Sequence, residues 1–220
     1  ITDANQLTIS HGSNIENVIT GSGDDIVIGT DLDNVILTGS GSDTIFAGGG
    51  TDTIKPGTGA DKIDLSESVQ SRDTVTLDTS SSSDLEIDTI YGFAQGALGD
   101  IFDVSAILSS GFKFFPLVAS SFAPTANFGG GILRLTGSNT STATDLLGAL
   151  EVGGGFEPLS LDDGASALII SSDSQLTGDD QCVFSAENSG GEISVTQLAV
   201  LKGNALDIDQ WHVDNFSIIA

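Results

Sequence analysis

The feature that most constrains the fold is a run of five nonapeptides that fills residues 20–64 with nothing left over. They read TGSGDDIVI, GTDLDNVIL, TGSGSDTIF, AGGGTDTIK and PGTGADKID. The sixth place of each holds a short oxygen-bearing side chain: Asp25, Asn34, Asp43, Asp52 and Asp61. The eighth place holds a branched apolar side chain: Val27, Ile36, Ile45, Ile54 and Ile63. So strict a period predicts a stack of like structural units, each of which depends on its neighbours for burial.

Each nonapeptide divides into a glycine-rich turn and a β-strand of about three residues. Glycine suits the turn because it takes positive φ without steric penalty. It fills the second place at Gly21, Gly39, Gly48 and Gly57, and the fourth at Gly23, Gly41, Gly50 and Gly59. A strand this short cannot bury its apolar residue alone, so we expect stacked strands to form a ladder of Val and Ile.

The same stacking predicts two edges that hold the sixth-place residues. If two nonapeptides complete one coil, Asp25, Asp43 and Asp61 line the first edge. Asn34 and Asp52 then line the second edge. A partial repeat at residues 11–19, HGSNIENVI, would add Glu16 to that second edge.

The acidic edges predict calcium as the cofactor. Coils lie about 4.8 Å apart, so two neighbouring carboxylates would repel by roughly 3 kcal/mol at an effective dielectric of about 20. A Ca²⁺ ion between two turns reverses the sign, because it takes about six to eight oxygen ligands and the turns offer carboxylates and backbone carbonyls. We expect two ions on the first edge, one in each gap, and a weaker third on the second edge.

The second repeat departs from the pattern. Thr30 and Leu32 stand where the other repeats have glycine, and Asn34 stands where they have aspartate. Asp31 and Asp33 are the candidate replacements as ligands in this turn. The alternative interpretation of the whole run, as ordinary surface turns rich in Gly and Asp, does not account for five repeats in one register.

Two further short segments follow the repeats, DTIYGF at residues 88–93 and GDIFDVS at residues 99–105. The nonapeptides resemble the calcium-binding repeat of RTX proteins. The two short segments resemble the element that closes the β-roll in the C-terminal domain of serralysin-type metalloproteases and other secreted RTX proteins. The resemblance covers residues 12–105 and implies a calcium-loaded parallel β-roll with a capped end. Asp100 and Asp103 are candidate ligands of a further ion in the cap, with turn capping as the alternative.

From Ile107 onward the pattern changes to longer strands between Gly, Ser and Asp loops. We therefore expect an all-β chain in four parts: approach strands over 1–19, the roll over 20–64, a capping element over 65–106, and a β-sandwich-like, β-rich C-terminal module over 107–220. The final DIDQWHVDNFSIIA resembles the uncleaved C-terminal signal of type I secretion substrates. A last β-strand is the alternative, and both can hold for the same residues.

Charge and motifs exclude several function classes. The chain has 31 Asp and Glu against 6 Lys and Arg, for a formal charge of −25, which repels nucleic acid and anionic lipid. The single cysteine, Cys182, allows no internal disulfide, so metal is the candidate staple. No apolar run is long enough to span a bilayer. Neither H-E-x-x-H nor G-x-S-x-G occurs, so we expect no enzyme activity.

Together these features predict the calcium-binding C-terminal module of a larger bacterial protein, secreted or held at the cell surface. Its partners would be calcium ions and the type I secretion machinery, and it would fold on calcium after export. Two alternatives stay open. One is a surface-layer or adhesin segment in which calcium mediates assembly with copies of itself or contact with cell-surface polysaccharide. The other is the non-catalytic tail of a secreted hydrolase.

Overall fold

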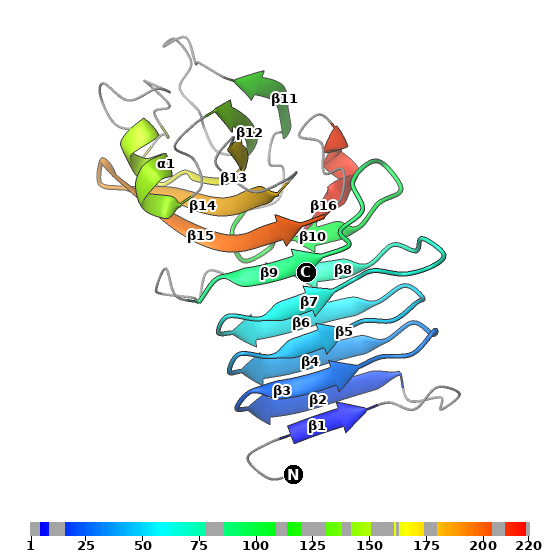
Figure 1. Cartoon of the computed structure of the whole chain (residues 1–220). Helices are drawn as coiled ribbons and strands as arrows, with labels where there is room; N and C mark the ends of the chain where they lie inside the picture. Colours follow the sequence, from blue (N-terminus) through cyan, green and yellow to red (C-terminus); the bar gives the residue numbers. More distant parts are fainter. Residues whose placement is uncertain are drawn as a thin grey trace.

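A computed structural model describes residues 5–8, 16–77, 86–108, 114–119, 131–137, 142–150, 161, 163–173, 180–203 and 210–218. The expected approach strands and the partial repeat lie outside these ranges at residues 1–4 and 9–15, and the C-terminal segment at residues 207–209 and 219–220. Parts of the expected capping element, at residues 78–85, and of the C-terminal module also lie outside them. The described part is nearly all β and is built on a stack of short parallel strands, as the repeats predict (Figure 1).

The stack has two sheets, and the chain alternates between them. One sheet contains β2 (Asn17–Ser22), β4 (Val35–Ser40), β6 (Thr53–Thr58), β8 (Thr74–Thr76), β10 (Ile101–Asp103) and β16 (Phe216–Ser217). The other begins with β1 (Asn5–Thr8), β3 (Asp25–Ile28), β5 (Thr44–Phe46), β7 (Lys62–Asp64) and β9 (Asp88–Tyr91). This is the parallel β-roll that the sequence predicts.

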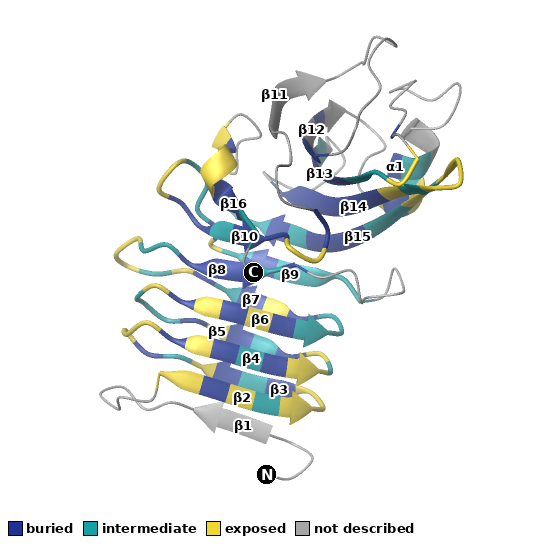
Figure 2. Cartoon of the chain, turned by 180° about the vertical axis from the view of Figure 1, so that it is seen from behind, coloured by how far each residue is buried: buried dark blue, intermediate teal, exposed yellow. Residues whose placement is uncertain are grey.

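The strand register confirms that two nonapeptides make one coil. Ile36 of β4 pairs with Val18 of β2 below it and with Ile54 of β6 above it, and Ile45 of β5 pairs with Val27 and Ile63 in the same way. Each step is therefore eighteen residues. The eighth-place side chains are fully buried between the two sheets, where Figure 2 shows the dark blue column. Burial of each stabilises the roll by about 1.5–3 kcal/mol relative to exposure.

The coiling does not stop where the nonapeptides stop. Val75 of β8 pairs with Ile54, and Ile90 of β9 pairs with Ile63, so β8 and β9 add one further strand to each sheet of the roll. Phe102 of β10 pairs in turn with Val75. These apolar residues extend the buried ladder because they repeat the eighth-place role without the nine-residue spacing. The segment expected as a cap is thus a continuation of the roll.

The C-terminal strands extend one of the roll's sheets. β15 (Glu192–Lys202) lies parallel to β9, and β14 (Gln181–Ser189), β13 (Ser166–Asp173), β12 (Gly131–Gly137) and β11 (Phe114–Ala119) follow in that order. The expected sandwich therefore differs from the structure in one respect: these described strands form one continuous sheet with the roll. Its second apolar cluster includes Cys182 and Phe184 of β14 and Leu146 of helix α1 (Ala143–Leu150).

A cluster of aromatic rings closes the upper end of the roll. Trp211 stacks on Phe102 and Phe216, with ring centroids 5.9 and 5.4 Å away. The Trp211 indole also donates a 2.7 Å hydrogen bond to the Gln181 side chain of β14. The last described strand, β16, pairs with β10. The C-terminal segment therefore covers the hydrophobic ladder that would otherwise face solvent.

Candidate metal centre

The first edge of the roll holds a column of aspartates joined by hydrogen bonds. The Asp25 amide donates to Asp43 Oδ1 at 2.8 Å, and the Asp43 amide donates to Asp61 Oδ1 at 2.8 Å. The Asp61 amide donates in turn to Asp88 Oδ1 at 3.0 Å. Each carboxylate is therefore held between its own coil and the coil before it. The three predicted residues of this edge do stand one above another.

The second edge holds a matching column. The Asn34 amide donates to Asp52 Oδ1 at 2.7 Å, and the Asp52 amide donates to Asp73 Oδ1 at 2.8 Å. The Asp73 amide donates to Asp100 Oδ1 at 3.0 Å. Two residues of this column, Asn34 and Asp52, are those predicted from the repeats. The column continues for two coils beyond them.

The hydrogen bonds leave some buried carboxylate oxygens without a donor. Asp25, Asp43, Asp52 and Asp73 are at most 3% exposed, and one oxygen of each has no hydrogen-bond partner in the described structure. A buried polar atom without a partner costs about 1–3 kcal/mol, and more when it is charged. Carboxylate oxygens are the ligands that Ca²⁺ prefers. The residues present therefore fit a calcium ion in the gaps between turns.

Burial also changes the ionisation of these acids. Desolvation raises the pKa of Asp52 to about 8 and the pKa of Asp73 to about 7, against the lowering effect of the amide hydrogen bonds. Desolvation raises the pKa of Asp43 as well, with a further contribution from the neighbouring Asp25 charge. In both columns, these buried carboxylates are therefore stabilised either by a proton or by a bound cation, because the free charged form is unfavourable there.

Two glycines let the backbones of successive turns approach closely. Gly57 has φ of 99°, and a Cβ placed on it would lie 1.9 Å from the Gly39 carbonyl oxygen. A Cβ on Gly59 would lie 2.0 Å from the Gly41 carbonyl oxygen. Gly57 and Gly59 are therefore required both for positive φ and for close approach of successive coils.

The described residues contain no cluster of three or more His, Cys, Asp or Glu side chains of the kind that surrounds a metal ion by itself. Four of the five repeats carry one sixth-place carboxylate, and Ca²⁺ accepts backbone carbonyl oxygens as ligands besides carboxylates.

The degenerate second turn satisfies its own polar groups. Asn34 Oδ1 accepts a 2.8 Å hydrogen bond from the Thr30 amide, and the Thr30 hydroxyl accepts one from the Leu32 amide at 3.2 Å. Asp33 Oδ1 accepts from the Thr51 amide of the next coil at 2.8 Å. Asp31 is exposed on the outer side of this turn. The Thr30 and Asn34 side chains thus satisfy backbone amides of their own turn.

The two acids expected in the cap both act on backbone amides. Asp100 accepts the Asp73 amide on Oδ1 and the Ala94 amide on Oδ2, at 3.0 and 2.7 Å. Asp103 Oδ1 accepts the Ser105 amide at 3.0 Å. These contacts favour the turn-capping alternative for both residues.

The repeat arithmetic missed the acids that extend the columns, namely Asp73 and Asp88. Both lie in turns longer than the repeat, since their coils are 21 and 27 residues above Asp52 and Asp61. A local signal was present, because each stands two residues before a buried apolar residue, Val75 or Ile90. That spacing is the same as between the sixth and eighth places of a nonapeptide.

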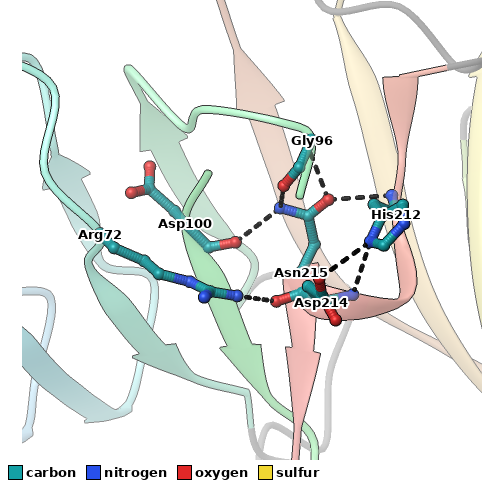
Figure 3. Close-up of polar contacts among 6 residues, drawn as sticks. All are labelled: Arg72, Gly96, Asp100, His212, Asp214 and Asn215. Carbon is teal, nitrogen blue, oxygen red and sulfur yellow. Dashed lines mark hydrogen bonds and ion pairs between the residues drawn. The ribbon is translucent and has the colours of Figure 1, made fainter. Parts of the chain in front are cut away.

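At the upper end of the second column, an amide side chain occupies the turn formed by residues 95–100 (Figure 3). Asn215 Oδ1 accepts from the Gly96 amide at 3.1 Å and from the His212 amide at 2.9 Å. Its Nδ2 donates to the carbonyl oxygens of Gly96 and Asp100, at 3.0 and 2.8 Å. Arg72 donates to the Asp214 carbonyl beside it, at 2.5 Å. The C-terminal segment is therefore fastened to the last coil by polar as well as aromatic contacts.

Comparison with known families agrees with this geometry. Residues 28–63 match the family model of the RTX calcium-binding nonapeptide repeat, in four copies. A comparison with curated proteins found no match. Residues 28–63 are therefore an RTX calcium-binding region. Such repeats form β-rolls, are in general non-catalytic and are typical of secreted proteins.

Proposed function

From the RTX region and its two acidic columns, we propose that this chain is a module of a secreted protein whose folding depends on calcium. Asp25, Asp43 and Asp61 would hold two ions on the first edge. Asp52, with the degenerate turn of Asn34, would hold a weaker ion on the second. The observation that carries this proposal is the set of buried carboxylate oxygens that receive no hydrogen bond.

The physical basis is that repulsion between stacked carboxylates destabilises the fold until the charges are neutralised. When bound, Ca²⁺ supplies positive charge and about six to eight positions for oxygen ligands. The chain contributes the stacked carboxylates, whose repulsion is roughly 3 kcal/mol per neighbouring pair at about 4.8 Å. With a Kd of about 10⁻⁴ M and calcium at about 10⁻³ M, each ion adds about 1.4 kcal/mol to stability. Two or three ions are enough to decide whether a marginally stable module folds.

Export by the type I route is the second part of the proposal. The composition of residues 207–220 supports it, as does the typical occurrence of RTX repeats in secreted proteins. In the described residues, no helix is both long and apolar enough to cross a membrane. A chain with a formal charge of −25 would stay unfolded at low calcium and fold where calcium is near millimolar.

The test is a calcium titration of chelator-treated protein, followed by far-UV circular dichroism, with bound ions counted by calorimetry. We expect a cooperative gain of β-signal and at least two ions bound near 10⁻⁴ to 10⁻³ M. A chain that folds fully in chelator and takes up no calcium would contradict the proposal. Sedimentation of the same samples separates folding of single chains from calcium-mediated assembly.

A further inference from the structure

The outer face of one sheet of the roll is partly apolar. Two residues in each of β3, β5, β7 and β9 flank the buried ladder residue and face outward. Parallel pairing arranges them in two columns, one of Ile26, Thr44, Lys62 and Thr89, and the other of Ile28, Phe46, Asp64 and Tyr91. All eight are exposed or half-buried. Ile28 and Phe46 are paired neighbours, 40% and 38% exposed, and they form an apolar patch on the surface.

The same face of this sheet is covered in the C-terminal half. Thr89 of β9 pairs with Val200 of β15. Val200 packs against the apolar cluster that contains Cys182 of β14 and Leu146 of helix α1, which lies beside β14 and β15 in Figure 1. The face is therefore a packing surface above β9. It continues from β9 down to β3 with its outward residues exposed or half-buried.

This exposed part of the face carries no net charge. Lys62 and Asp64 are the only charged residues among the eight, whereas the chain as a whole has a formal charge of −25. At an ionic strength of about 0.15 M the Debye length is about 8 Å, so acids on more distant parts of the surface are largely screened. A second copy of this acidic chain therefore meets less repulsion at this face than at the acidic turns.

Lys62 and Asp64 also make the face complementary to itself. Both belong to β7, one in each column. In a dimer whose two-fold axis runs along the roll between the columns, each column faces the other column of the second copy. Lys62 of each copy then faces Asp64 of the other, and Ile26 faces Ile28 in the same way. Opposite charges across an interface fix its register and disfavour other pairings.

The outer face of the other sheet lacks this property. Its exposed apolar residues include Ile19 and Val35, at 74% and 38%. Its strands β2, β4 and β6 contain one charged residue, Lys55, and no acid. Two copies of that face would bring like charges together with no opposite charge in these strands to compensate. It therefore serves as the control surface.

We propose that two copies of this chain associate through the outer faces of β3, β5, β7 and β9, packed as in a β-sandwich with the sheets about 10 Å apart. The association needs a folded roll but no bridging ion, so it does not rest on the calcium-binding function proposed above. A standard interface has about 20–30 residues a side. A face of eight described residues therefore fits a weak dimer.

Sedimentation of the full chain in CaCl₂, over about 10⁻⁶ to 10⁻³ M protein, tests this interface. Phe46→Thr removes an exposed apolar side chain, and Val35→Thr is its control, because Val35 is equally exposed on the other sheet. Lys62→Glu removes the complementary charge, and Lys55→Glu makes the same change of charge on the other sheet. The double variant Lys62→Glu with Asp64→Lys exchanges the two charges and restores their complementarity. Circular dichroism of the same samples confirms that each variant folds.

We expect the wild type to dimerise, and Phe46→Thr and Lys62→Glu each to raise the dissociation constant at least about tenfold. Both control variants should associate as the wild type does, and the charge exchange should recover most of the loss. A wild type that stays monomeric throughout, an equal effect of Lys55→Glu and Lys62→Glu, or assemblies larger than a dimer would overturn the interface. So would a charge exchange that recovers nothing. A chain that folds and dimerises equally in chelator would instead refute the calcium-dependent folding and leave this interface standing.

Discussion

For removal of the Asp43 charge, the calcium hypothesis predicts lower stability of the calcium-loaded protein and higher stability of the calcium-free protein. Its carboxylate stands between Asp25 below and Asp61 above, and both gaps of the first edge therefore border it. Asp43→Asn keeps an Oδ1 that accepts the Asp25 amide but removes the charge. The substitution should therefore weaken two ions while leaving the backbone contact intact.

The magnitudes follow from mass action and from burial. Loss of two ions at about 1.4 kcal/mol each lowers the stability of the calcium-loaded fold by about 2.8 kcal/mol at about 10⁻³ M calcium. Without calcium, the same substitution should stabilise the fold instead. Desolvation raises the pKa of Asp43, so its ionised form is unfavourable in the fold. The uncharged amide removes the repulsion in both neighbouring carboxylate pairs, which is roughly 3 kcal/mol for each pair and roughly 6 kcal/mol at most.

The assay is urea unfolding of wild type and variant at fixed pH 7.5, in chelator and over a calcium series. Asp24→Asn is the matched control, because Asp24 is exposed in the turn directly below that of Asp43, and its Oδ1 accepts the Ser42 amide at 2.8 Å. We expect Asp24→Asn to stay within about 0.5 kcal/mol of the wild type. Asn34→Ala should raise the calcium midpoint of folding less than Asp43→Asn does. The reasoning is refuted if Asp43→Asn matches Asp24→Asn in calcium, or if it destabilises the calcium-free fold.

Three further predictions concern the close contacts, the upper end and the pH response. Gly57→Ala should destabilise the roll by more than about 3 kcal/mol in thermal unfolding, because its Cβ would lie 1.9 Å from a carbonyl oxygen. Gly21→Ala is the control and should be nearly neutral, because a Cβ there meets nothing within 4 Å. Asn215→Ala should lower the free energy of unfolding, measured by calorimetry, by about 3 kcal/mol, since it removes four hydrogen bonds and leaves backbone groups unsatisfied. An unchanged melting temperature would show that the aromatic contacts alone hold the segment. The raised pKa values of Asp52 and Asp73, about 8 and about 7, mean that the calcium-free fold binds more protons than the unfolded chain between about pH 4 and 8. Its melting temperature should therefore fall as pH rises through that window, and a rise would contradict the burial of ionisable groups.

Much of the roll follows from local sequence, and the reason is its strict period. A sixth-place acid that stands two residues before an apolar residue has the same position in every coil, so the sequence alone places Asp25, Asp43 and Asp61 on one edge. The structure bears out that stacking. The assignment of ions to these acids stays a prediction that the titrations test.

The turns after the repeats were less predictable because their lengths differ. Asp73 and Asp88 continue the two columns, yet insertions move them out of the nine-residue count.

By itself, the sequence determined the coil, its two edges and its acidic chemistry, because those properties depend on contacts between residues a fixed distance apart in the chain. The tertiary structure alone decided how the stack ends and where the described C-terminal strands lie. Leu201 of β15 pairs with Ile90 to extend one sheet, and Asn215 fills the last turn from 119 residues beyond Gly96. Such long-range contacts have no period, and they form because the exposed end of a hydrophobic ladder must be covered by whichever segment can both pack on it and satisfy its backbone groups.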